Sequence, residues 1–339
     1  MNQRSPRIAI VRLSALGDIV NTTIVLQLIR RHYPDAHITW VCESVFAPLL
    51  QDHPQIDRVH AVSIKALKKS KRFKDFLSIR AELKKLGPFD KIIDLQGLLK
   101  SAIVARMLGK NVHGFSKDSS REGIGAFFYA TTTQIAYTEN IIRRNVQLVA
   151  DALDFRYTLT QIREKETTLP SYEFPYFLDP KKKNIAIVIG ASWPSKQYPK
   201  ESYAAVCQAL GQQVQCHIVW GNEAEKKMAE WIAKKSNNAT LTPQLSLSEL
   251  SNLFAHCDLS IGNDTGPTHM AWAHNRPSIV LFGPTTARMM YETPINIALK
   301  SPSKVDLMHI NKNDFSIHQI NIHSVVNTAK KLLDTPSAR

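Results

Sequence analysis

The chain has 339 residues, of which 44% are hydrophobic and 21% are charged, and its formal net charge is +14. This length exceeds that of a typical single core, so we expect two domains. The positive charge favours an anionic partner, such as a nucleic acid, a phosphorylated metabolite or an acidic membrane surface. The excess is uneven, because residues 58–121 hold sixteen Lys and Arg against five Asp and Glu.

The cysteines and the apolar runs indicate in which cellular compartment the protein is expected. Four widely spaced cysteines form no CxxC pair and no His-rich cluster, which indicates reduced thiols in a cytoplasmic protein and argues against a disulfide framework or a zinc site. The N-terminal stretch RIAIVRLSALGDIV is interrupted by charged residues, and no run reaches the roughly 18 apolar residues that a membrane span needs. We therefore expect any membrane association to be peripheral.

In the first half of the chain, apolar runs alternate with helical patterns. The β-branched run RIAIVRL at residues 7–13 is typical of a buried parallel strand, and the following apolar periodicity predicts a helix that ends before Pro34. Further strands are predicted at 37–44 and 91–97, and a helix at 98–108.

The alternation restarts after an irregular, proline-containing stretch at 156–183. We place the linker at 166–183, between an N-terminal domain at 1–165 and a C-terminal domain at 184–320, with a final helix within 321–339. Two doubly wound α/β domains are predicted, in which ligands bind beyond the carboxyl ends of the strands. The predicted strands of the second half are 184–192, 215–221, 258–264 and 278–284, and its helices are 200–211, 223–235, 246–257 and 322–334.

The first strand-to-helix junction contains one glycine, Gly17, followed by Asp18. A dinucleotide fold would need G-x-G-x-x-G here and a P-loop would need G-x-x-x-x-G-K-[ST], and neither is present. Asp18 has two interpretations: it stabilises the start of the helix, or it acts as a general base.

A second junction at 261–277 carries more polar groups. Asn263, Asp264, Thr265 and Gly266 follow a strand and precede a helix that contains His269. Free amides and hydroxyls at this point suit a diphosphate, and Asp264 suits sugar hydroxyls. The alternative is an ordinary capped turn with a buried histidine.

Three other features follow predicted strands or carry charge. Lys196 is either a phosphate-binding cation or a solvated surface lysine, and Glu225 is either a ribose ligand or a residue favoured by the helix dipole. The basic stretches at 65–74 and 116–123 either collect phosphates of an acidic acceptor or form a solvated face.

Taken together, these motifs resemble glycosyltransferase family 9, the ADP-heptose-dependent heptosyltransferases of bacterial lipopolysaccharide synthesis. The resemblance runs over nearly the whole chain. It is carried by RLSALGD (12–18), IIDLQGLLKSA (92–102), SREGIGAFFY (120–129), GASWPSKQYP (190–199), WGNEAE (220–225) and GNDTGPTHMAWAHNRP (262–277).

The resemblance implies a GT-B fold: two Rossmann-like domains facing across a cleft, the first binding the acceptor and the second the donor, with the terminal helix packing back on the first. It implies an inverting, metal-independent enzyme without a cofactor, which moves heptose from ADP-L-glycero-D-manno-heptose to the inner Kdo of Kdo2-lipid A at the inner face of the cytoplasmic membrane. A family member that adds heptose to heptose remains an alternative. A nucleic-acid-binding protein is disfavoured, because no recognition helix, RRM, KH or zinc module is evident.

The resemblance also implies roles for single residues. Asp18 corresponds to the base that takes the proton of the acceptor hydroxyl, and Lys196 to a residue that contacts the donor phosphates. The other implied donor-binding residues are Ser192, Glu225, Leu245, Asp264, Thr265, Gly266 and His269, and the implied acceptor-binding residues are Lys65, Lys68, Lys69 and Arg121.

Overall fold

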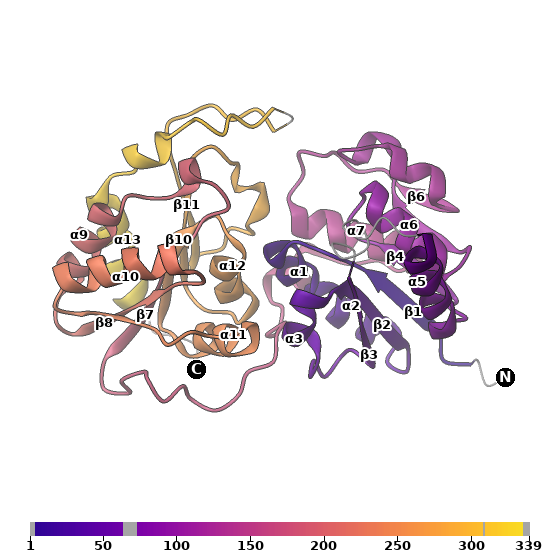
Figure 1. Cartoon of the computed structure of the whole chain (residues 1–339), viewed down its shortest axis with the longest axis horizontal. Helices are drawn as coiled ribbons and strands as arrows, with labels where there is room; N and C mark the ends of the chain where they lie inside the picture. The colour runs from indigo at the N-terminus through magenta and orange to yellow at the C-terminus, as the bar shows by residue number, and fades with distance from the viewer. Residues whose placement is uncertain (1–3, 64–72, 308, 335–339) are drawn as a thin grey trace. The chain divides into compact units, whose positions relative to one another are not determined.

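Two units make up the chain, Met1–Thr168 and Leu169–Arg339. Figure 1 shows the computed structural model, which describes residues 4–63, 73–307 and 309–334. The division falls within the predicted linker at 166–183. Part of the stretch expected to be irregular is helical, because Thr158 caps a short helix, α8 (Leu159–Arg163), by accepting a hydrogen bond from the backbone amide of Gln161.

The first unit contains a parallel six-stranded sheet in the order β3-β2-β1-β4-β5-β6. Its strands are β1 (Arg7–Val11), β2 (His37–Glu43), β3 (Arg58–Val62), β4 (Lys91–Asp94), β5 (Val112–Phe115) and β6 (Thr131–Thr133). Its helices are α1 (Leu16–Thr22), α2 (Ile24–His32), η1 (Ser44–Phe46), α3 (Ala47–Leu50), α5 (Phe73–Leu86), α6 (Leu99–Leu108), η2 (Lys117–Ser119), η3 (Ile124–Phe128), α7 (Ile141–Leu153) and α8.

The second unit repeats this plan with the order β12-β11-β10-β7-β8-β9. Its strands are β7 (Lys183–Val188), β8 (Val214–Val219), β9 (Ala239–Leu241), β10 (Leu259–Asn263), β11 (Ser278–Phe282) and β12 (Asn296–Lys300). Its helices are η4 (Pro194–Lys196), α9 (Lys200–Leu210), α10 (Glu223–Lys235), α11 (Leu247–His256), α12 (Gly266–Ala273), η5 (Ala287–Met289), η6 (Ser316–Gln319) and α13 (Ile322–Asp334).

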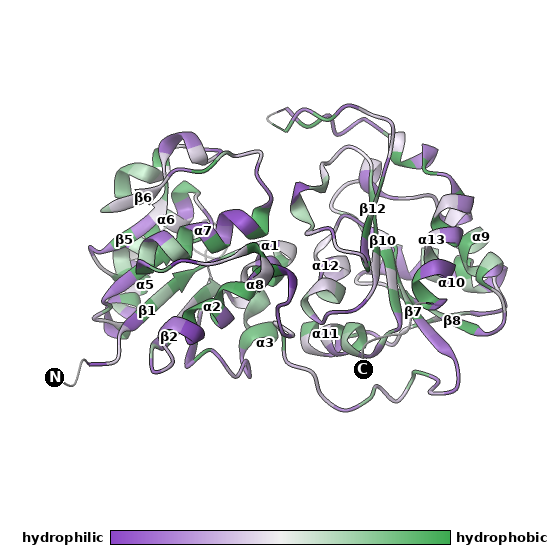
Figure 2. Ribbon diagram, turned by 180° about the vertical axis from the view of Figure 1, so that it is seen from behind, coloured by the Kyte–Doolittle hydropathy of each residue, from purple (hydrophilic) through white to green (hydrophobic). Residues whose placement is uncertain are grey.

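The central strands of both sheets are buried on both faces. Every residue of β10 is buried, and β1 is buried from Ile8 to Val11. Figure 2 shows β7 and β10 as mainly hydrophobic segments between flanking helices. Parallel strands with two covered faces are typically continuous apolar runs, and this is why the sequence predicted these strands.

The terminal helix α13 is part of the second unit's core. It packs on α9, and Val325, Val326 and Ala329 belong to the hydrophobic core of that unit. The expected packing of this helix on the first domain stays a prediction. Figures 1 and 2 show α9 and α13 on one side of the second sheet and α11 and α12 on the other. The apolar face of α13 is buried against its own unit because it completes one of the two helix layers of a doubly wound sheet.

The four cysteines are all buried and free of disulfide bonds, as expected. No helix within residues 4–63, 73–307 and 309–334 is long and apolar enough to cross a membrane.

Candidate active site

The strand order of each sheet reverses between two neighbouring strands, β1 and β4 in the first unit and β7 and β10 in the second. Ligands of doubly wound sheets bind beyond the carboxyl ends of the strands at this reversal. Asp18 follows β1, Lys196 follows β7 and Asp264 follows β10. Three residues predicted from sequence therefore lie where the topology places binding sites.

Asp264 is the centre of a buried polar cluster. Its Oδ2 atom accepts hydrogen bonds from Lys196 Nζ at 2.9 Å and from Thr285 Oγ1 at 2.8 Å. Its Oδ1 atom lies 3.1 Å from Nε2 of His269, which is one helical turn further along the chain. These contacts join three turns of the second unit, those after β7, β10 and β11.

Burial by itself would raise the pKa of Asp264, but the hydrogen bond from His269 and the charge of Lys196 hold this pKa well below its usual range. The side chain of Lys196 is only 9% exposed. Lys196 is therefore not a solvated surface lysine. It is a buried cation, and an ionised carboxylate sets the position of its ammonium group.

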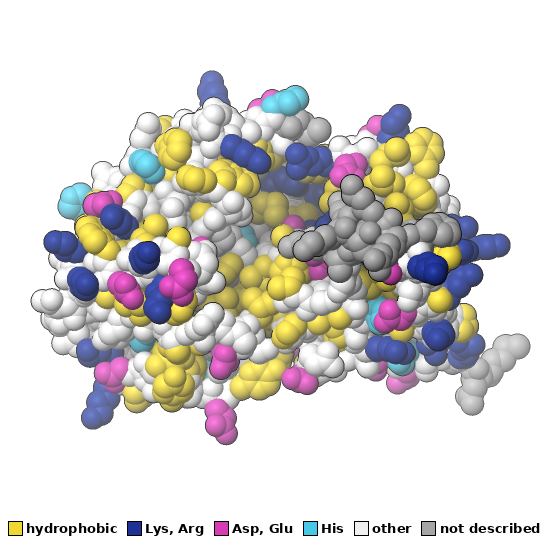
Figure 3. Space-filling model, viewed as in Figure 1, with side chains coloured by type: hydrophobic (Ala, Val, Ile, Leu, Met, Phe, Trp, Pro, Cys, Tyr) yellow, Lys and Arg dark blue, Asp and Glu magenta, His cyan; other side chains and the backbone are white. Residues whose placement is uncertain are grey.

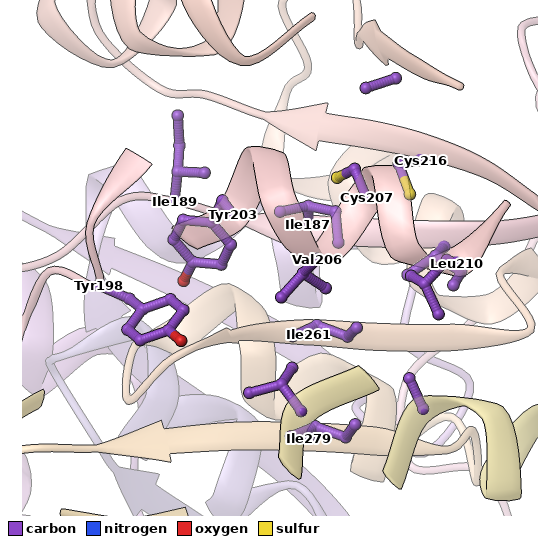
Figure 4. Close-up of a cluster of buried hydrophobic side chains, with 14 of the residues drawn as sticks. Ile187, Ile189, Tyr198, Tyr203, Val206, Cys207, Leu210, Cys216, Ile261 and Ile279 are labelled. Carbon is purple, nitrogen blue, oxygen red and sulfur yellow. The ribbon is translucent and has the colours of Figure 1, made fainter. Parts of the chain in front are cut away.

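Asn263 fixes the two turns that carry this pair. Its Nδ2 donates to the carbonyl oxygens of Ile189 at 3.0 Å and Gly190 at 3.1 Å, and its Oδ1 accepts from the backbone amide of Tyr198 and the hydroxyl of Tyr203, both at 3.0 Å. Figure 4 shows the rings of Tyr198 and Tyr203 side by side at the end of the apolar core. The hydrogen bonds of Asn263 thereby connect the end of β10 to the turn that follows β7.

The start of α12 requires close packing. A Cβ atom added at Gly262 would lie 2.5 Å from Val188 Cβ and 2.8 Å from Thr268 Oγ1, so a side chain is excluded there. Thr265 occupies the N-cap position and Gly266 is the first helical residue. The first amides of a helix have no intrahelical acceptor, so this end of α12 suits an anion.

The turn after β7 presents further polar groups. Trp193 has two ammonium groups over its ring, with Lys196 Nζ 5.0 Å and Lys312 Nζ 5.4 Å from the ring centroid. Ser195 is buried, and its hydroxyl has no hydrogen-bond partner within the described residues. Ser192 is exposed in the same turn. Lys312 was not predicted, because it lies far from any strand end in the sequence.

Glu225 and Leu245 lie at the starts of α10 and α11. Glu225 Oε2 accepts from the backbone amide of Gly221 at 2.7 Å, so it caps the beginning of α10. Its carboxylate also lies against the turn after β7, since a Cβ atom at Gly190 would be 2.8 Å from Glu225 Oε1. Leu245 is half-buried and precedes Ser246, the N-cap of α11. Glu225 lies in the first turn of α10, where the helix dipole favours a carboxylate, and its contact with ribose stays a prediction.

Asp18 lies in the first turn of α1. Its Oδ1 atom is 2.7 Å from Nη2 of Arg12, and its Oδ2 atom accepts from the backbone amide of the N-cap Ala15 at 3.2 Å. Arg12 is buried and also donates to the carbonyl oxygen of Leu95. The side chain of Asp18 is 25% exposed. It therefore stabilises the helix start and still presents its carboxylate to solvent, so the first interpretation is confirmed and the second is left open.

Sequence reasoning missed four polar residues beside Asp18. Lys100 Nζ lies 2.9 Å from Ser14 Oγ and 3.3 Å from Glu43 Oε1. Gln96 Oε1 accepts from the amide of Leu13 at 2.9 Å. Ser14 and Gln96 follow β1 and β4, Glu43 ends β2 and Lys100 is the second residue of α6, so polar residues at the ends of apolar runs were the available signal.

The family model for glycosyltransferase family 9 (heptosyltransferase) matches residues 77–311, more than half of the chain. The chain belongs to glycosyltransferase family 9. It is 36% identical to lipopolysaccharide heptosyltransferase 1 of Campylobacter coli, over 96% of this chain and 98% of that protein. It is 30% identical to lipopolysaccharide heptosyltransferase 1 of Pseudomonas aeruginosa, over 82% of this chain and 79% of that protein.

Solved structures share the fold. The E. coli heptosyltransferase WaaC with ADP has a TM-score of 0.81 at 22% identity, over 96% of this chain and 99% of that chain. The E. coli ADP-heptose heptosyltransferase II has a TM-score of 0.70 at 19% identity, over 96% of this chain and 98% of that chain. The expected GT-B architecture of two doubly wound units is thereby confirmed, and this family-9 chain is a glycosyltransferase.

Of the expected acceptor-binding residues of this family-9 enzyme, Arg121 lies within the described part of the chain. Arg121 is exposed between η2 and η3. Lys65, Lys68 and Lys69 lie outside the described residues, so their role stays a prediction.

Proposed function

We propose that this family-9 glycosyltransferase transfers heptose from ADP-L-glycero-D-manno-heptose to the inner Kdo of Kdo2-lipid A, with inversion at the anomeric carbon. The observation that carries the proposal is the buried cluster of Lys196, Asp264, His269 and Thr285 at the strand reversal of the second unit. A sugar-nucleotide transferase needs a fixed positive group at the place where diphosphate charge develops, and this cluster supplies one.

The second unit binds the donor. Lys196 neutralises charge on the departing diphosphate, and Asp264 holds the ammonium group in place without a rearrangement during the reaction. The first amides of α12 are further donors to phosphate oxygens. Lys312 adds a second positive charge beside Trp193. Glu225 binds the ribose hydroxyls, and Leu245 packs against the base.

The first unit binds the acceptor. Asp18 takes the proton of the attacking Kdo hydroxyl while the hydroxyl oxygen forms a bond to the anomeric carbon. The bond between that carbon and the diphosphate oxygen breaks on the opposite face, and ADP leaves with the bonding electrons. Arg12 holds the Asp18 carboxylate in one orientation through the 2.7 Å contact, and general-base assistance of this kind is worth about 10²- to 10⁴-fold in rate.

The names of the relatives support the choice of substrates. Two relatives with at least 30% identity are named lipopolysaccharide heptosyltransferase 1, and one solved neighbour is named for a complex with ADP-2-deoxy-2-fluoro heptose. A relative named lipooligosaccharide heptosyltransferase 2 is 24% identical. We propose that the enzyme acts in the cytoplasm, peripheral to the inner membrane that holds its acceptor.

The test is an assay of the purified protein with ADP-heptose and two acceptors, Kdo2-lipid A and its heptosylated derivative, with mass and linkage analysis of the products. We expect one heptose to be added to Kdo2-lipid A. Transfer only to the heptosylated acceptor would instead establish the alternative enzyme, which adds heptose to heptose. Transfer to neither acceptor would refute the proposed substrates.

We further propose that the reaction needs no metal ion, because Lys196 supplies the positive charge that Mg²⁺ supplies in many nucleotide-sugar enzymes. The expected result is that EDTA leaves the transfer rate unchanged, measured as ADP release over a range of EDTA concentrations. A loss of activity that Mg²⁺ restores would contradict this role of Lys196.

A further inference from the structure

The loop between β5 and β6 exposes two large apolar side chains. Phe127 is 82% exposed and Ile124 is 50% exposed, and both belong to the short helix η3. Figure 3 shows exposed hydrophobic side chains bordered by basic ones on the first unit. Exposed apolar side chains grouped on one element indicate a contact surface.

This loop is tied to the body of its unit. Glu122 Oε2 accepts from the backbone amide of Leu99 at 2.7 Å, and the Tyr129 hydroxyl donates to Asp94 Oδ2 at 2.8 Å. Nη2 of Arg144 donates to the carbonyl oxygen of Ser119 at 2.5 Å. Because the anchors lie on both sides of η3, the exposure of Ile124 and Phe127 is a property of an ordered element.

The anchors place the loop beside the edge that carries Asp18. Leu99 is the first residue of α6, and the next residue, Lys100, contacts Ser14 in the turn before Asp18. An acceptor bound at this edge therefore lies near η3.

The excess of positive charge on the first unit favours an anionic partner for this surface. Residues 1–168 contain 26 Lys and Arg against 16 Asp and Glu, whereas residues 169–339 contain 17 against 13. Within the loop, Lys117 and Arg121 are exposed, and the exposed carboxylate of Asp118 offsets one of these two positive charges. The carboxylate of Glu122 accepts the hydrogen bond from the amide of Leu99 at the start of α6. The loop thus exposes apolar side chains on a strongly basic unit. This combination favours binding to an anionic bilayer, because a second copy of the chain would be equally basic and would be repelled.

We propose that η3 is the membrane-docking element: Phe127 and Ile124 enter the interface of a bilayer with anionic headgroups, and the positive charge of the first unit holds the enzyme there. The proposal rests on the proposed function in one respect, namely that the acceptor is a membrane glycolipid. The docking itself needs no acceptor and is measured without one.

The experiment is flotation of the full chain with vesicles of phosphatidylethanolamine and phosphatidylglycerol at 3:1, and with phosphatidylcholine vesicles, at low and high salt. We expect binding to the anionic vesicles that weakens with salt. Phe127→Ser should weaken it by about tenfold or more, since one buried phenylalanine side chain contributes that much to partitioning. Lys117→Gln should lower the binding at low salt to a smaller extent.

Tyr176→Ser is the matched control, because Tyr176 is 88% exposed and lies on the second unit. This substitution should leave vesicle binding unchanged. Equal losses for Phe127→Ser and Tyr176→Ser, or no binding of the wild type to anionic vesicles, would overturn the proposal. So would a concentration-dependent dimer without lipid that Phe127→Ser abolishes, measured by sedimentation velocity.

A second measurement separates docking from the reaction. Phe127→Ser should slow transfer to Kdo2-lipid A embedded in vesicles and leave transfer to a deacylated, soluble acceptor unchanged. Equal rates for the variant and the wild type on the embedded acceptor would count against docking through η3. If neither acceptor is used while the vesicle binding holds, the proposed substrates fail and the docking surface stands.

Discussion

Replacing Asp18 with asparagine is expected to lower kcat by about 10²- to 10⁴-fold and to leave ADP affinity unchanged. Asparagine keeps the size of the side chain and a hydrogen-bond acceptor for the Ala15 amide, but it cannot take a proton from the acceptor hydroxyl. The proposed donor site lies on the other unit, built around Asp264. The measurements are initial rates at saturating substrates and calorimetric titration with ADP.

Asp35→Asn is the control for this variant, because Asp35 is an exposed aspartate of the same unit. Thermal unfolding of Asp18→Asn must be recorded as well, since the buried Arg12 loses a charged partner. If the Asp18→Asn protein is folded and retains near-normal kcat, Asp18 is not the base and its role is confined to the helix start.

Replacing Asp264 with asparagine is expected to lower the free energy of unfolding by roughly 3–5 kcal/mol and to abolish measurable ADP binding. The change leaves the ammonium group of Lys196 buried without its carboxylate. Because asparagine has a single acceptor oxygen, it cannot keep both the contact of Oδ1 with His269 and the hydrogen bond from Thr285 to Oδ2. Denaturant unfolding measures the first effect and calorimetric titration measures the second. Asp306→Asn, at an exposed aspartate of the same unit, should change neither.

A double variant separates the cost of burying an unpaired charge from the other costs of changing these side chains. Lys196→Met combined with Asp264→Asn should cost less stability than the sum of the two single changes, because the double variant has no unpaired buried charge. Additive costs would mean that the two side chains do not interact as the 2.9 Å contact implies.

The pH dependence of stability should also report the interaction of Asp264 with Lys196. The pKa of Asp264 is lower in the folded chain than in the unfolded one, so its contribution to stability is complete above the unfolded value of about 4 and is lost as the pH falls towards the folded value. The unfolding free energy of the wild type should therefore fall with pH below about 4 more steeply than that of Asp264→Asn. Parallel curves would argue against an ionised Asp264.

Much of the fold was predictable because the central strands are buried on both faces and form continuous apolar runs, as at 7–13 and 258–264. Several strands at or near the sheet edges were not recognised. The edge strand β6 is the tripeptide Thr131–Thr133 and β9 is Ala239–Leu241, and segments this short carry little periodicity. The packing of α13 on α9 was not predicted, because an amphipathic pattern shows that a face is buried and does not show what covers it.

The proposed donor site was predictable from the sequence as a set of residue types, but the arrangement of those residues was not. Asp264, Thr265 and Gly266 follow a strand that the sequence identifies, so their place at a carboxyl edge followed from the pattern. Lys196 lies 68 residues earlier in the chain, and its contact with Asp264 depends on the pairing of β7 with β10. Lys100 and Glu43 were missed for the same reason, since Glu43 ends β2 and Lys100 lies at the start of α6.

The sequence by itself determined the α/β class, the repeated two-unit plan, the family and the strand ends at which we propose the functional residues. These properties depend on neighbours a few residues apart, through the periods of strands and helices and the residues that follow them. Only the tertiary structure decided that Lys196 is buried against Asp264, that Arg12 holds Asp18 and that η3 exposes Phe127. Burial and pairing depend on strand order, which brings distant segments together and cannot be inferred from local spacing.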